Sequence, residues 1–65
     1  MHTYCLLKDG RKMVLFSDNI EDKTMDVYPL NKINEYLSGQ IPACERVKYT
    51  EIVWIDTDLE ALLVL

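Results

Sequence analysis

Residues 4–16 decide the fold of this chain and read YCLLKDGRKMVLF. Two apolar segments flank Asp9-Gly10. Such a pair is the strongest short signal for a β-hairpin, because both residues tolerate the positive φ of a type I′ turn. We expect the first strand over residues 2–8 and the second over residues 11–17. Since residues 13–16 are all apolar, the second strand is expected to be covered on both faces.

A polar segment and a helix are expected next. Residues 18–26 are rich in carboxylates and are expected to form a loop, with a short edge strand over residues 25–28 as the alternative for its second half. Pro29 suits the first position of a helix and Gly39 the left-handed residue that ends one, so a helix is predicted over residues 29–38. The apolar stripe that we expect this helix to bury against a sheet is Leu30, Ile33 and Leu37.

The last third of the chain contains one clear segment and one ambiguous segment. Residues 40–47 include Pro42 and are expected to be a connection, whereas residues 49–56 contain four consecutive β-branched or aromatic residues and are expected to form the central strand. The sequence from Thr57 to Glu60 matches a helix capping box, but a tight turn there would produce a hairpin instead. Because short terminal helices are marginal, a final strand is slightly favoured.

Together these segments predict one α+β domain over residues 1–65. Its antiparallel sheet has three to four strands in the order ββαβ(β), and one helix packs on one face. A chain of this size buries only about 60% of the surface that it exposes when unfolded, so support from an oligomer or a partner is expected. The sequence shows no signal-peptide pattern and no apolar run of the ~20 residues that span a bilayer. We therefore expect a cytoplasmic protein with no membrane partner.

The sequence offers little material for catalysis. Its single histidine, His2, lies at the terminus, where productive geometry is hard to hold. Cys5 and Cys44 are expected to be reduced thiols and, with one histidine, supply too few ligands for zinc. The carboxylates at Asp56 and Asp58 are likewise too few for a calcium loop. We therefore predict no catalytic, cofactor-binding or metal-binding residues, and no enzymatic activity.

Charge makes nucleic acid an unfavourable partner. Seven basic and eleven acidic residues give a net charge of −4, whereas phosphate recognition needs a basic face. The two glycines do not form a phosphate-binding loop. The basic residues near the first turn are more typical of a solvated hairpin end. Direct binding to nucleic acid is therefore not expected.

Acidic residues cluster in two places, and such charge attracts basic surfaces. The residues predicted to bind a partner are Asp18, Glu21, Asp22, Asp26, Asp56, Asp58 and Glu60. The chain is thus expected to be a small acidic interaction module, an inhibitor or regulator that binds a basic surface of another protein. One form of such a module occupies the nucleic-acid channel of its target, as phage-encoded and antitoxin-like proteins of this size do.

The apolar surplus of the strands predicts a homodimer, because one helix covers only one face of a sheet. The predicted dimer interface consists of Val14, Phe16, Val53, Ile55, Leu62, Leu63, Val64 and Leu65. The alternative function is a dimeric small-molecule-binding protein or enzyme with a site at the subunit interface. The aromatic residues for such a site are Tyr4, Tyr28, Tyr36, Tyr49 and Trp54.

Overall fold

Five antiparallel strands form the sheet, at least one more than the sequence predicts. The computed structural model describes all 65 residues. The strands are β1 (Tyr4–Leu7), β2 (Lys12–Asn19), β3 (Thr24–Pro29), β4 (Glu45–Lys48) and β5 (Ile52–Asp56). Their order across the sheet is β4-β3-β2-β1-β5, and each neighbouring pair is antiparallel. The α+β class and the antiparallel sheet are therefore confirmed.

Short helical segments connect and follow the strands. They are η1 (Leu30–Lys32), α1 (Ile33–Leu37), η2 (Tyr49–Glu51) and α2 (Leu59–Leu63). The first two occupy the segment predicted as one helix, and Gly39 follows with the expected positive φ of 93°. None of these helices has the length and apolar character needed to cross a membrane.

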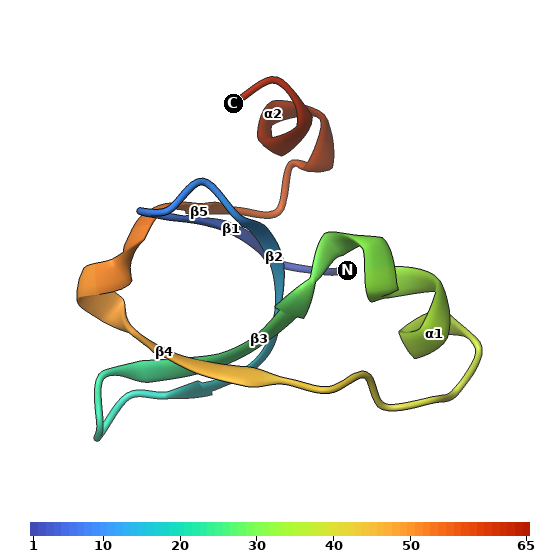
Figure 1. Cartoon of the computed structure of the whole chain (residues 1–65), viewed down its shortest axis with the longest axis horizontal. Helices are drawn as coiled ribbons and strands as arrows, with labels where there is room; N and C mark the ends of the chain where they lie inside the picture. Colours follow the sequence, from blue (N-terminus) through green and yellow to red (C-terminus); the bar gives the residue numbers. More distant parts are fainter.

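The sheet curls into a half-open barrel. Figure 1 shows β1 and β5 on one side of the curl and β3 and β4 on the other, with η2 bridging the two edge strands. Because residues directly opposite each other on paired strands share a face, the register divides the apolar residues into two sets. One set points into the curl and the other points away from it.

The inner set forms the larger of two apolar clusters. Its buried members are Cys5, Leu7, Met13, Val27 and Val47. Leu15, Met25 and Ile52 are partly buried and pack against them. The curvature of the sheet brings these side chains from all five strands together, so the inner face needs no additional layer.

The outer set is covered by the two helical regions. Its buried members are Tyr4, Val14, Tyr28 and Leu62. The residues packed against them are Leu6, Leu30, Ile33, Trp54 and Leu59. Figure 1 shows α2 beside β1 and β5, and α1 beside β3, both outside the curl. The expectation of one helix on one face is therefore wrong in detail, because a second helix contributes Leu59 and Leu62.

The β1–β2 turn differs from the predicted two-residue turn. Its loop has three residues, because the N–H of Gly10 donates to the Leu7 carbonyl at 2.9 Å and the N–H of Leu7 donates to the Arg11 carbonyl at 3.0 Å. Only Gly10 has a positive φ, 90°, and Asp9 does not. The Asp9 carboxylate instead accepts a hydrogen bond from the N–H of Arg11 at 3.1 Å. Glycine at the third loop position is the usual requirement of this kind of turn.

Two predicted connections contain strands. Residues 24–29 form β3, which lies between β2 and β4 and is therefore neither a loop nor an edge strand. Residues 45–48 form β4, in which only Val47 is buried and the other three side chains are exposed and charged. Such a strand has a single apolar position, so no alternation of apolar residues is visible in the sequence.

Three expectations about individual elements also need correction. The strand in residues 49–56 is an edge strand that begins at Ile52, after η2. The C-terminal segment is helical, since the Asp58 side chain caps α2 and Leu62 is completely buried. Leu30 and Ile33 pack against the outer cluster as expected, but Leu37 is 65% exposed because α1 is only five residues long.

Candidate interaction surfaces

Three acidic residues of the β2–β3 hairpin, Asp18, Glu21 and Asp22, form no ion pair in the structure. Asp18 accepts a hydrogen bond from the Tyr49 hydroxyl, and this bond raises the pKa of Tyr49 because it stabilises the protonated phenol. Glu21 and Asp22 are exposed in the turn, beside Lys23. Lys23 has a left-handed φ of 55°, and its N–H donates to the Ile20 carbonyl at 3.3 Å, which closes this turn.

Asp26 is held within the sheet and does not stand free for a partner. Its Oδ1 accepts a hydrogen bond from Arg46 Nε at 3.0 Å, and its Oδ2 accepts one from the Ser17 hydroxyl at 3.0 Å. The Arg46 guanidinium, followed by Ser17, lowers the pKa of this carboxyl. The ion pair links β3 to the edge strand β4 and is only partly exposed. Asp26 therefore has a structural role in the sheet, and its role in partner binding stays a prediction.

The second acidic cluster, at the β5–α2 turn, has no ion-pair partner. Asp56 accepts a hydrogen bond from the N–H of Thr57, and Asp58 accepts one from the N–H of Ala61 at 3.2 Å. Glu60 is exposed in the first turn of α2. The four ion pairs of the structure involve none of these three carboxylates. This turn is therefore a concentration of uncompensated negative charge.

The two acidic clusters do not form one surface. In Figure 1 the tip of the β2–β3 hairpin and the β5–α2 turn lie at well-separated positions, with the curl of the sheet between them. The structure thus separates residues that the sequence groups by charge alone.

The apolar residues predicted to form a dimer interface divide into a buried pair and an exposed set. Val14 and Leu62 are completely buried within the outer cluster of one copy, so they belong to the core and not to an interface. The exposed members are Phe16, Val53, Ile55, Leu63, Val64 and Leu65. Each of these exposes between 42% and 84% of its surface.

A cluster of aromatic rings, which we call the aromatic patch (His2, Phe16 and Tyr36), was not predicted from the sequence. The Tyr36 ring meets the rings of His2 and Phe16 edge to face, with centroids 5.6 and 6.4 Å apart. It also stacks on Tyr28 at 5.8 Å. Such arrangements favour aromatic pairs beyond the area that they bury. The rings come from three separate segments, so only their tertiary arrangement reveals the patch.

A β-bulge exposes Phe16. Leu15 pairs with Val27 and Ser17 pairs with Asp26, so Phe16 is an extra residue in β2 with no partner on β3. Bulges of this kind redirect side chains locally. The Phe16 ring contacts Tyr36, and 42% of the residue remains exposed. The run of four apolar residues predicts instead that both faces of this strand are buried.

Of the five aromatic residues proposed for a site at a subunit interface, four lie at the outer cluster and only Tyr49 lies apart from it. Tyr4 and Tyr28 are buried in the outer cluster, and Tyr36 stacks on Tyr28. Trp54 packs against the same cluster, whereas Tyr49 bonds to Asp18 on the β2–β3 hairpin. The Tyr28 hydroxyl is buried without a hydrogen-bond partner, and burial raises its pKa.

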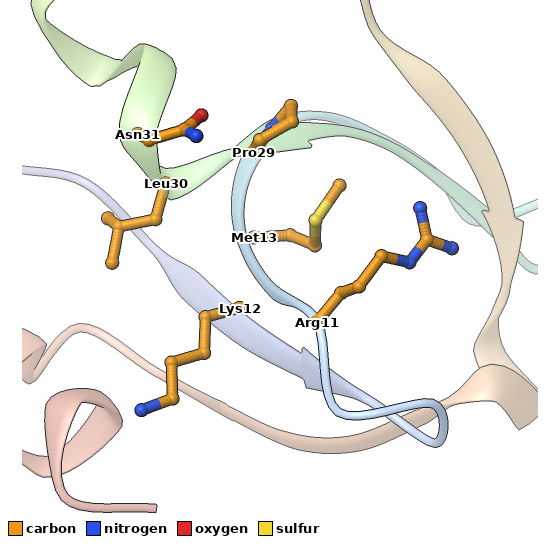
Figure 2. Close-up of a pocket in the computed structure, with 6 residues that line it drawn as sticks. All are labelled: Arg11, Lys12, Met13, Pro29, Leu30 and Asn31. Carbon is orange, nitrogen blue, oxygen red and sulfur yellow. The ribbon is translucent and has the colours of Figure 1, made fainter.

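The largest hollow in the chain is an open groove of about 400 Å³ between the β1–β2 turn and η1. Figure 2 shows Met13 in its middle, with Pro29 and Leu30 on the η1 side and the two basic side chains on the other. Arg11 is already neutralised by Asp9 and by Glu45, whose oxygens it contacts at 2.8 and 3.0 Å.

The remaining basic side chain of the groove also has a partner. Lys12 Nζ donates to the carbonyl oxygen of Leu63, at the end of α2, at 3.2 Å. Its side chain therefore reaches across to the neighbouring helix, as Figure 2 shows. The groove offers an apolar floor, and the Lys12 ammonium, which bonds to a backbone carbonyl and forms no ion pair, is its one charge without a counter-ion.

The thiols are in contrasting environments. Cys5 is completely buried in the inner cluster, and burial raises the pKa of its thiol to about 11. Cys44 is exposed, and its Sγ lies 3.5 Å from the Pro42 carbonyl oxygen. Burial and the nearby Asp26 charge raise the pKa of the Cys44 thiol. No group of three or more histidine, cysteine or carboxylate side chains is arranged to hold a metal ion.

Comparisons with protein-family models, with curated proteins and with solved structures found no significant match.

Proposed function

We propose that this chain is a small acidic, non-enzymatic interaction module that regulates another protein by binding to a basic surface of it. The proposal concerns the class of function. It assigns the contact to exposed apolar side chains and unpaired carboxylates of this chain, with no cofactor.

The observation that carries the proposal is the amount of apolar surface left uncovered. Eleven large apolar side chains are exposed, although the curl of the sheet and two helical regions already cover both of its faces, where nine apolar residues are buried. Exposed apolar patches in small proteins are typical of contact sites for other proteins. Because these apolar side chains stay exposed after the chain has folded, we expect a partner protein to bury them.

Charge supports a basic partner. Both arginines are paired with carboxylates, and so is Lys32. The β5–α2 turn keeps three unpaired carboxylates next to exposed apolar residues of β5. Such a combination attracts a basic surface over a distance and then buries apolar area on contact.

A capture experiment at low and high salt tests this proposal. The immobilised chain is expected to retain a specific protein at low salt and to release most of it at high salt, because exposed charges are screened beyond about 8 Å at physiological ionic strength. Purified target activity should fall in proportion to added chain until the two are equimolar. Turnover of a metabolite by the chain alone, with no protein retained, would contradict the proposal.

A second candidate function is favoured by the groove beside η1. Its volume of about 400 Å³ falls within the range of small-molecule sites, which is about 300–1,000 Å³. The same chain is therefore tested against a metabolite panel by ligand-detected NMR. Binding that is lost in an Asn31→Trp variant, which adds bulk at an exposed position lining the groove, while the fold is retained, would support this alternative.

The predicted homodimer stays a prediction with a reduced interface. The sequence predicts a dimer because one face of the sheet is expected to be uncovered. In the structure, however, a single copy covers both faces of its sheet. Phe16, Val53, Ile55 and the exposed residues 63–65 remain as candidate contacts. Light scattering distinguishes a 7.6 kDa monomer from a dimer.

A further inference from the structure

We propose that the free edge of β5 is the docking site, and that it takes an extended segment of the partner as an added antiparallel strand with apolar residues at its centre and lysine or arginine at one end. This inference rests on the proposed function and specifies how binding occurs. β5 pairs with β1 alone, so its second edge carries no strand. Exposed edges of this kind are templates for an additional strand.

The two edges of the sheet differ in their protection. β4 has the sequence Glu-Arg-Val-Lys, and charged side chains on an edge strand discourage pairing with another chain. β5 has the sequence Ile-Val-Trp-Ile-Asp and carries no charge before its last residue. Of the two edges, β5 is therefore the one that remains open to a sixth strand.

Side chains along β5 provide apolar contacts for such a strand. Val53 is 56% exposed because it is an extra residue in β5, opposite the step between Leu6 and Leu7 of β1. Ile55 is 45% exposed and points toward the open side of the curl. With Ile52, Met25 and Tyr49 it lines a hollow of about 220 Å³ whose lining residues are all apolar. This hollow has room for an apolar side chain of the added strand.

Charge at the end of β5 defines the partner segment. Asp56 ends the strand, and Asp58 and Glu60 follow it directly, all three exposed and without ion pairs. A strand lying along β5 would place one of its ends beside these carboxylates. Lysine or arginine at that end is attracted, whereas acidic residues are repelled.

The same charges argue against a second copy of this chain as the occupant. A second copy supplies no basic residue within β5 (Ile52–Asp56), so in an antiparallel pair of two β5 strands Asp56 of each copy would lie opposite an uncharged residue or opposite Asp56 itself. Like charges opposite each other destabilise a strand pair, and an uncharged neighbour leaves the carboxylate unpaired. The acidic ends of β5 therefore select a different chain with basic residues.

A synthetic peptide of alternating valine and threonine with three lysines at its N-terminal end is the probe, because an antiparallel strand places its N-terminus beside the C-terminal end of β5. Its binding to the full chain is measured by fluorescence anisotropy and its location by amide chemical shifts. We expect the largest shifts along residues 52–56, and binding that weakens as salt rises. A peptide with N-methyl groups on the amides that would face β5 should bind about tenfold or more weakly, since it cannot complete the hydrogen-bond ladder.

Substitutions in the chain itself, rather than in the peptide, also test the edge of β5. Val53→Lys should weaken binding about tenfold or more, because a lysine on an edge strand opposes pairing. Val64→Lys, the same change at a more exposed valine on the tail (84% against 56% for Val53), is the control and should bind within about twofold of the parent chain. The emission of Trp54 and the circular dichroism confirm that each variant is folded.

Two triple variants separate the acidic clusters. The first, Asp56→Asn, Asp58→Asn and Glu60→Gln, keeps the hydrogen-bond acceptors and removes three charges, and it should weaken binding and flatten its salt dependence. The second, Asp18→Asn, Glu21→Gln and Asp22→Asn, makes the same charge change on the β2–β3 hairpin. We expect it to leave binding largely unchanged.

Several results would overturn the docking site. They are a peptide that does not bind or that binds equally well after N-methylation, shifts centred away from β5, and unchanged binding to the Val53→Lys variant. A self-associating chain whose dimer is lost in Val53→Lys would identify a second copy as the occupant. If salt-dependent capture of a protein persists in that variant, the proposed function stands and the β5 mode is wrong.

Discussion

Asp58 shows how one side chain determines the structure of a segment. Its backbone is extended, with φ −89° and ψ 101°, and its carboxylate accepts a hydrogen bond from the N–H of Ala61. This geometry is that of a helix N-cap, which satisfies one of the N–H groups that the first turn leaves free. The capping box in the sequence is displaced by one position, because Asp58 rather than Thr57 is the cap.

Replacing this cap should weaken α2 in a predictable order. Asp58→Ala is expected to lower the free energy of unfolding by about 1 kcal/mol, whereas Asp58→Asn should change it by much less, since asparagine also caps helices. Chemical denaturation followed by circular dichroism measures both variants. Equal losses for the two would show that the charge of Asp58, and not its hydrogen bond, stabilises the helix.

At the scale of elements, α2 depends on packing rather than on its own propensity. Five residues are far fewer than an isolated helix needs for stability in water. Leu62, completely buried against Tyr4, Val14 and Tyr28, is the contact that holds this helix on the sheet. Trp54 packs against the same cluster, so its fluorescence reports on the docking of α2.

A matched pair of leucines in α2 tests this view. Leu62→Ala should cost about 2–5 kcal/mol, the usual range for truncating a buried leucine. Leu63→Ala, a chemically identical change at a residue that is 56% exposed, should cost less than about 0.5 kcal/mol. Denaturant titration with Trp54 emission measures both. Similar costs for the two positions would mean that α2 does not dock as described.

At the scale of the whole molecule, ion pairs connect strands that are distant in sequence. Arg11 contacts Asp9 within the β1–β2 turn and Glu45 on β4, while Arg46 on β4 contacts Asp26 on β3. Hydrogen bonds from the two arginines lower the pKa of each of these carboxyls. Each group therefore binds protons less readily in the folded state than in the unfolded state.

This difference predicts how the pairs respond to acid. The stabilisation is complete above the unfolded carboxyl pKa of about 4 and is lost as the pH falls through the lower folded values. The Tm difference between the parent chain and Arg11→Met should therefore be largest near neutral pH and shrink below about pH 4. Lys8→Met, which removes an exposed unpaired charge from the same turn, is the control. Identical pH profiles for the two variants would contradict this assignment.

The sequence by itself determined the parts of the fold that depend on local conformation and on continuous apolar runs. The β1–β2 hairpin follows from Asp9-Gly10 between two apolar segments, and the helical region after Pro29 follows from a proline start, a glycine end and one apolar stripe. Among the candidate site residues, the exposed apolar positions Val53 and Ile55 and the acidic turn after them could be identified from residue type alone.

Tertiary structure decided the rest, because the deciding interactions join residues that are distant in sequence. β4 has one apolar residue and becomes a strand only by pairing with β3, which in turn lies inside the sheet because the β2–β3 turn closes at Lys23. Curvature of the sheet and the docking of Leu62 cover both faces, so Val14 is core rather than interface. The edge position of β5 follows from the order of the strands in the sheet. Local sequence does not encode this order, because the pairing of strands depends on loop closure and on burial shared across the whole chain.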